Sequence, residues 1–181
     1  MKTMKLVQAL CPLVFLLACS TSTSNASVLE DACKSYGAKH PDIGYGYCIK
    51  FFQANRGSAA ADKRGLAGIA VKIIGAAARD TSKHVAALKA SEKDKKRAAC
   101  LRSCDEVYSM AVSEIAVAAN GIASGTAGGL GDAVTALGSV LDAPGTCEQG
   151  FQDLHVPSLL AAEDAEFRRK ATVTLAVAAA L

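Results

Sequence analysis

Residues 95–120 read KKRAACLRSCDEVYSMAVSEIAVAAN, and this stretch decides the fold class. Cys100, Cys104 and Tyr108 follow one another at steps of four, which places all three on one face of a helix. Apolar residues continue this pattern at alternating steps of three and four: Leu101, Cys104, Tyr108, Ala111, Ile115 and Ala118. A cysteine on the buried face of an amphipathic helix suggests a covalent tie to another element. The best candidate partner in the sequence is Cys147.

Three further segments show a helical pattern, at residues 59–89, 132–143 and 159–181. Asn120-Gly121 is a helix stop, and the five glycines of 121–131 predict a flexible interhelical loop. Pro144-Gly145 is expected to interrupt the third helix just before Cys147. Strand-like alternation is scarce. The expected fold class is therefore all-α, a bundle with closely packed, alanine-lined seams.

Composition and charge argue against several function classes. The chain has 181 residues, which favours one domain, and its formal net charge is +3. Loss of Lys2 and Lys5 with a leader peptide would leave 18 basic against 17 acidic residues, a net charge of +1. This balance does not indicate nucleic-acid binding. We interpret the basic run at 93–97 as a solvated helix start.

The N-terminal residues have the layout of a secretory signal peptide. Lys2 and Lys5 precede an apolar segment at 6–19, and small polar residues follow. We predict a signal peptide at 1–26, a mature domain at 27–181 and a secreted protein. A lipoprotein-like box ending at Cys19 is a competing interpretation, and Asn25 begins a formal glycosylation sequon at the expected cut. The apolar residues 175–181 are too few for a membrane anchor, so we expect no membrane attachment after cleavage.

The mature segment holds five cysteines, so one thiol remains unpaired or pairs between molecules. Cys33 and Cys48 flank a segment rich in Pro and Gly, which predicts a turn between two short helices. A bridge across this segment would contribute roughly 3 kcal/mol to stability. A Cys104–Cys147 bridge would tie the second long helix to the third and leave Cys100 as the free thiol. Cys100 and Cys104 are poorly placed to bridge each other on a straight helix.

The sequence gives no positive sign of catalysis, and we expect no enzyme, no catalytic residue, no metal and no cofactor. None of His40, His84 and His155 has a metal-binding spacing to another ligand, and His84 falls on an apolar helix stripe. The adjacent acids Glu163 and Asp164 should diverge around a helix rather than converge on one substrate. The glycines of 121–131 lack the Gly-Lys-Ser/Thr of a phosphate loop.

Taken in order, these motifs resemble the plant pectin methylesterase inhibitor and invertase inhibitor family. The resemblance rests on Cys33 and Cys48 around a Pro-containing turn, on CDEVY at 104–108, on TCEQGF at 146–151, and on the alanine- and leucine-rich last helix. It covers residues 30–181, and the chain is most similar to the subgroup that contains tree-pollen allergens labelled "putative invertase inhibitor". The single motifs are weak, whereas the ordered set together with a secretory signal is fairly specific.

The resemblance implies an up-down four-helix bundle preceded by a small N-terminal helical hairpin. It implies disulfides Cys33–Cys48 and Cys104–Cys147, the pairs that the residues already favoured. It also implies a monomeric inhibitor, secreted to the plant cell wall space (the apoplast), that binds a carbohydrate-active enzyme and occludes its active-site cleft. A rigid, preorganised binder avoids the free-energy cost of ordering on association.

The target is expected to be a pectin methylesterase, with acid invertase as the alternative. Members that inhibit invertase have a Pro-Lys-Phe stretch before the third long helix. The matching segment, 121–132, contains none of these three residue types. A second alternative, a secreted helical small-ligand-binding protein without inhibitory activity, would need a cavity in the bundle core. No residue of the enzyme-binding surface is predicted.

Overall fold

A computed structural model describes residues 22–181, and every regular element in this range is helical. Most of the predicted leader, including Cys19 of the lipoprotein-like box, lies outside the described residues. The side chain of Asn25 also lies outside the described part of the structure. The elements in chain order are α1 (Ser22–Lys39), α2 (Gly44–Gln53), the short 3-10 helix η1 (Ser58–Ala60), α3 (Lys63–Ser91), α4 (Lys95–Ser124), α5 (Ala127–Asp153) and α6 (Ala161–Ala178). Within residues 22–181, no helix is both long enough and apolar enough to cross a bilayer.

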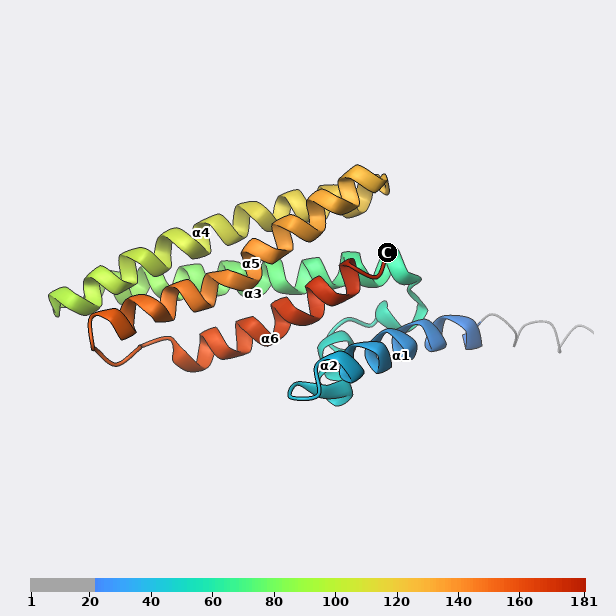
Figure 1. Cartoon of the computed structure of the whole chain (residues 1–181), viewed down its shortest axis with the longest axis horizontal. Helices are drawn as coiled ribbons and strands as arrows, with labels where there is room; N and C mark the ends of the chain where they lie inside the picture. The colour runs from blue at the N-terminus through green and yellow to red at the C-terminus, as the bar shows by residue number, and fades with distance from the viewer. Residues whose placement is uncertain (1–21) are drawn as a thin grey trace, which may run out of the picture.

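Helices α3 to α6 form an up-down four-helix bundle, and α1 with α2 form a hairpin beside α6 (Figure 1). Each bundle helix packs on its chain neighbour, and α6 closes the bundle by packing on α3. The all-α fold class and the preceding hairpin that the sequence predicted are therefore confirmed. Short connections make antiparallel neighbours the natural outcome, as in other bundles of this topology.

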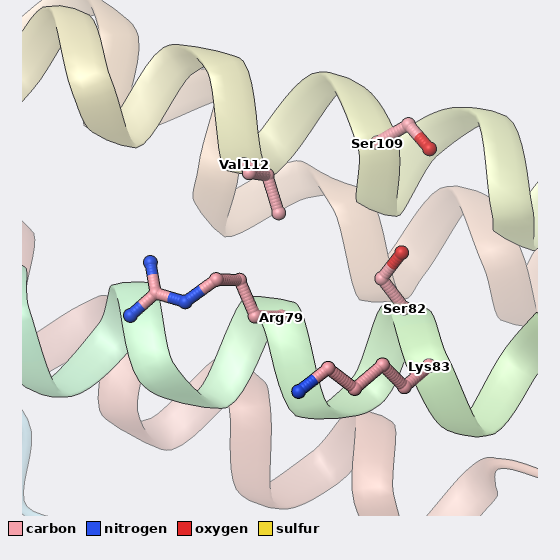
Figure 2. A pocket seen from close by; sticks show the side chains of 5 residues that line it. All are labelled: Arg79, Ser82, Lys83, Ser109 and Val112. Carbon is pink, nitrogen blue, oxygen red and sulfur yellow. The ribbon is translucent and has the colours of Figure 1, made fainter.

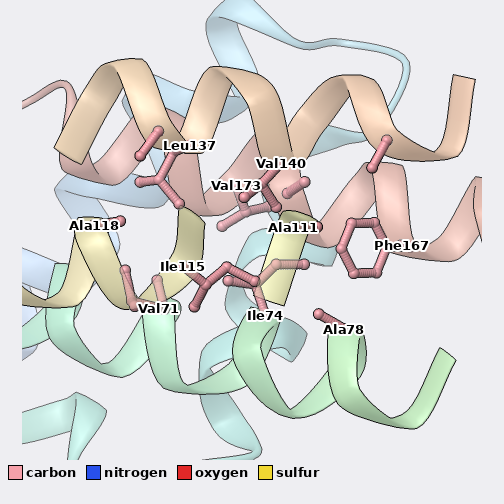
Figure 3. Close-up of a cluster of buried hydrophobic side chains, with 14 of the residues drawn as sticks. Val71, Ile74, Ala78, Ala111, Ile115, Ala118, Leu137, Val140, Phe167 and Val173 are labelled. Atoms are coloured by element: carbon pink, nitrogen blue, oxygen red, sulfur yellow. The ribbon is translucent and has the colours of Figure 1, made fainter. Parts of the chain in front are cut away.

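The core is built from small and branched residues that face the bundle axis (Figure 3). Alanines alternate with larger side chains along each buried seam, so the helices approach closely without large aromatic layers. The labelled set in Figure 3 comprises Val71, Ile74, Ala78, Ala111, Ile115, Ala118, Leu137, Val140, Phe167 and Val173, drawn from all four bundle helices. The buried face of α4 contains every residue of the stripe read from residues 95–120.

The prediction of a flexible, glycine-rich loop at 121–131 is wrong. Helix α4 continues to Ser124, Gly125 ends it in the left-handed conformation with φ of 66°, and α5 begins at Ala127 after the N-cap Thr126. Gly121 lies where the two helices cross so closely that an added Cβ would be 2.1 Å from the carbonyl oxygen of Gly129. These glycines therefore serve helix packing and capping, uses that composition alone does not separate from a flexible loop.

The expected interruption at Pro144 is also wrong, since α5 runs from Ala127 to Asp153 through this residue. A proline inside a helix removes one backbone hydrogen bond and costs about 3 kcal/mol. Pro144 is buried, and it shares a helix face with the buried residues Cys147 and Phe151. Packing of this face against the bundle offsets the local cost, so the helix continues.

The N-termini of α3, α4 and α5 are capped by the side chains of Asp62, Asp94 and Thr126. Asp62 caps α3 by accepting from the Gly65 amide at 2.7 Å, and Asp94 caps α4 by accepting from the Arg97 amide at 2.9 Å. Such caps satisfy amide groups that have no partner within the helix.

Candidate functional site

Two disulfides hold the elements that carry the cysteine motifs. In the structure, Cys33 on α1 bonds to Cys48 on α2, and Cys104 on α4 bonds to Cys147 on α5. The remaining cysteine within residues 22–181, Cys100, is buried and donates a hydrogen bond from Sγ to the carbonyl oxygen of Gly150 at 3.2 Å. Burial raises the pKa of the Cys100 thiol, which disfavours the reactive thiolate. The thiol thus packs as a small apolar group between α4 and α5.

The three histidines are not brought together by the fold. His40, in the turn after α1, stacks on Tyr36 with ring centroids 4.7 Å apart. His84 on α3 lies half exposed, with Nδ1 2.5 Å from Oε2 of Glu163 on α6. His155 follows α5 with a positive φ of 52°. The exposed position of His84 corrects its placement on the apolar stripe.

The adjacent acids of α6 diverge as predicted, but one of them enters the core. Glu163 turns outward to His84, whereas Asp164 is 2% exposed and accepts a hydrogen bond from the hydroxyl of Tyr108. Phe167 packs edge-on against the Tyr108 ring at 5.1 Å between centroids. The sequence did contain a signal for this, because Asp164, Phe167 and Ala171 follow helical spacing on the buried face of α6.

Asp164 is the buried member of an acidic cluster between α4, α5 and α6. Its Oδ2 has no hydrogen-bond partner, and Glu148 from α5 lies next to it while accepting from the Ser158 hydroxyl. Burial, with the neighbouring Glu148 and Glu163 charges, raises the pKa of Asp164 to about 8. Burial and the bond to Asp164 also raise the pKa of the Tyr108 hydroxyl. The carboxyl of Asp164 is therefore held neutral at acidic pH.

The same cluster has the spacing of a metal site but not its chemistry. Ligand atoms of Cys147, Glu148 and Asp164 lie within 4.8 Å of one another. Cys147 is bonded to Cys104, so its sulfur is not available as a thiolate. The two carboxyl groups that remain are fewer than the protein ligands that a zinc centre uses. The cluster is a structural feature of the core.

The bundle surface is electrostatically asymmetric. Helix α3 carries six basic residues and one acidic residue, Asp80, whereas α5 carries four acidic residues and no basic one. These two helices are diagonal in the bundle, because each packs on α4 and α6. One edge of the molecule is therefore positive and the opposite edge negative, although the chain as a whole is close to neutral.

Two shallow grooves run between α3 and α4 on the positive side. One has a volume of about 330 Å³ and lies among Arg79, Ser82 and Lys83 of α3 and Ser109 and Val112 of α4 (Figure 2). The other, of about 360 Å³, lies nearer the start of α3 and the end of α4. Both grooves combine cationic side chains from α3 with small uncharged side chains from α4.

These features define an all-helical protein that is held together by two disulfides. The sequence profile described as plant invertase/pectin methylesterase inhibitor matches residues 27–177, and the chain belongs to this family. Family members are inhibitor proteins rather than catalysts, and their partners are enzymes.

Individual relatives agree with this membership. A protein named "Putative invertase inhibitor" from Platanus acerifolia is 25% identical over 176 residues, which cover 96% of this chain and 97% of the relative. A pectinesterase inhibitor from Actinidia deliciosa is 30% identical over 105 residues, 58% of this chain and 55% of the relative.

Solved structures show the same fold. A crystal structure of a pectin methylesterase inhibitor from Arabidopsis thaliana has a TM-score of 0.59 at 17% identity and covers 86% of this chain and 96% of its own. A mutant form of a pectin methylesterase inhibitor from Arabidopsis has a TM-score of 0.65 at 20% identity. This match covers 76% of this chain and 89% of the chain in that structure. The all-helical bundle fold is thus shared across low sequence identity.

Proposed function

We propose that this protein is a secreted, monomeric inhibitor that binds a plant pectin methylesterase in the apoplast and occludes its active-site cleft. The observation that carries this proposal is the family match over residues 27–177, which spans the hairpin and nearly all of the bundle. Removal of a signal peptide at 1–26 would leave the matched domain, which begins at residue 27, intact. The two bridges of the structure are proposed to form in the secreted protein, where the environment is oxidising.

Rigidity gives the bundle its capacity to inhibit. The Cys104–Cys147 bridge holds α4 on α5, and the hydrogen bond between Tyr108 and Asp164 holds α4 on α6. The hairpin is held to α6 by the Tyr47 hydroxyl, which donates to Glu166 Oε1 at 2.8 Å. A surface that is already ordered loses little conformational freedom on association, so more of the contact energy is expressed as affinity.

The connection between α4 and α5 favours pectin methylesterase over invertase. Invertase-inhibiting members are expected to place a Pro-Lys-Phe stretch before the third long bundle helix. Here that place is taken by the two helix ends, joined through only Gly125 and Thr126. The connection is too short to extend a recognition loop towards an enzyme, and it lacks those three residue types.

One observation supports the alternative target, acid invertase. The relative that matches 96% of this chain carries the name of an invertase inhibitor, whereas the pectinesterase inhibitor from Actinidia deliciosa matches 58%. The names of both relatives favour inhibition over the carriage of a small ligand. A direct comparison of the two enzymes therefore decides the target.

The test is inhibition by the folded mature protein, residues 27–181, of a plant pectin methylesterase and a plant acid invertase in parallel. Both assays are run at mildly acidic and at neutral pH, after both bridges have been mapped by mass spectrometry. We expect stoichiometric inhibition of the pectin methylesterase and no effect on the invertase. Inhibition of the invertase alone would move the target to the alternative. Inhibition of neither enzyme by correctly bridged protein would overturn the proposal.

A further inference from the structure

Four exposed cations form a straight row on α3. We name Arg64, Lys72, Arg79 and Lys83 the α3 cation row. Their spacings of eight, seven and four residues keep them within about 100° of arc on the helix. At 1.5 Å per residue the row extends for about 28 Å along the helix axis. It is therefore an elongated positive strip rather than a local cluster.

The row borders the two grooves between α3 and α4. Arg64 and Lys72 line the groove of about 360 Å³, and Arg79 and Lys83 line the groove of about 330 Å³ (Figure 2). The α4 wall consists of uncharged and mostly small residues: Ser109, Val112, Ala119, Ile122 and Ala123. Such a wall lets an extended chain lie flat along the groove, with its charges turned to α3.

The charges of the row are largely uncompensated. Among residues 22–181, no carboxylate forms an ion pair with Arg64, Lys72 or Arg79. Lys83 has one acidic neighbour, Asp80, at 4.0 Å, and both side chains are more than three-quarters exposed, so this pair contributes little. By contrast, Lys89, near the end of the same helix, pairs with Asp105 of α4.

The one carboxylate that lines the grooves is already engaged. Asp62, at the start of α3, accepts from the Gly65 amide as the helix cap. The acid-rich helix α5 lies diagonally across the bundle from α3. The positive electrostatic potential of the α3 cation row therefore extends outward over the grooves, where it would attract an anionic ligand.

We propose that the α3 cation row and its grooves bind a linear, carboxylate-bearing polysaccharide, namely the de-esterified pectin that a pectin methylesterase leaves behind. Hydrolysis of each methyl ester converts a neutral group into a carboxylate, so the reaction itself creates a polyanion. The length of the row matches an extended polymer, and its spaced cations match repeated charges. The choice of this polymer rests on the proposed function. Its consequence is retention of the inhibitor where de-esterification has already occurred.

The test measures retention of the mature protein in native gels that contain polygalacturonate or highly methyl-esterified pectin, without any enzyme present. We expect retention by polygalacturonate only, weakening as salt is added because the contacts are exposed ion pairs. A variant that neutralises the row should bind about tenfold or more weakly. A control variant neutralises four exposed cations elsewhere and has the same net charge. The row variant is R64Q, K72Q, R79Q and K83Q; the control is K39Q, K50Q, K93Q and R102Q.

Each outcome decides the proposal. Weak binding by the row variant and near-normal binding by the control, with unchanged circular dichroism for both, supports it. Equal losses in both variants, or equal retention by the methyl-esterified polymer, overturns it. Failure of the unsubstituted protein to bind polygalacturonate also overturns it. If the row variant then loses enzyme inhibition, the row is assigned to contact with an acidic enzyme surface. Inhibition by the unsubstituted protein is scored separately, so failure of the proposed function remains distinguishable.

Discussion

The hydroxyl of Tyr108 on α4 donates a hydrogen bond to Oδ1 of Asp164 on α6, inside the four-helix bundle. Tyr108 is completely buried, and Asp164 is 2% exposed. The bond crosses the bundle between helices separated by the whole of α5 in the sequence. It leaves Oδ2 of Asp164 without a partner. A buried carboxyl group in this setting is more stable neutral than charged.

The stability of the protein should fall as pH rises. The pKa of Asp164 is about 8 in the folded protein, above the ordinary value of 3.8. The contribution of the neutral carboxyl is therefore fully present below about pH 3.8 and is lost as pH rises through about 8. Urea denaturation across this range should show a declining midpoint. Asp164→Asn, which cannot ionise, should flatten the decline; an unchanged slope in this variant would assign the pH dependence to other groups.

Tyr108→Phe should destabilise the bundle by about 1–3 kcal/mol, because Asp164 loses its hydrogen-bond donor while the ring packing is kept. The edge-on contact with Phe167 does not involve the hydroxyl. Tyr108→Ala removes the ring as well and should cost about 3–5 kcal/mol. Chemical denaturation at acidic pH measures both. Equal losses in the two variants would show that packing is unimportant at this position.

Cys104→Ser should lower the free energy of unfolding by about 2–5 kcal/mol, since it removes the bridge between α4 and α5. Cys100→Ser is the matched control one turn earlier on the same helix. It should cost less than about 1 kcal/mol, because serine can still donate to the Gly150 carbonyl that accepts from the thiol. Thermal unfolding under non-reducing conditions compares them. A large loss in both would count against Cys100 being a free thiol.

Alanine substitutions at two glycines of the segment 121–131 should change the stability of the protein in opposite directions. Gly121→Ala places a Cβ at 2.1 Å from the Gly129 carbonyl oxygen, so the helices must separate, with a cost of about 1–3 kcal/mol. Gly131→Ala meets open space inside α5 and should stabilise the protein by up to about 1 kcal/mol. Thermal melting of the single variants tests this. Stabilisation by both substitutions would mean that α4 and α5 do not approach closely at Gly121, and no effect of either would indicate a flexible segment.

Sequence periodicity predicted the helical content well where a long amphipathic stripe was present. The face running from Leu101 to Ala118 is buried as expected, because its spacing matches the helix repeat. Glycine and proline signals were less reliable. Gly121 and Pro144 lie within helices, since packing against a neighbouring helix outweighs their local preferences.

The sequence by itself determined the all-α class, the amphipathic faces and the chemical character of each helix, because these depend on residues close together in the chain. Only the tertiary structure decided which distant groups meet. The Tyr108–Asp164 bond, the His84–Glu163 pair and the alignment of the α3 cation row with the α4 wall all follow from helix packing. The physical reason is that local periodicity fixes which face of a helix is buried, whereas the partner of that face is set by how all four helices fill one core.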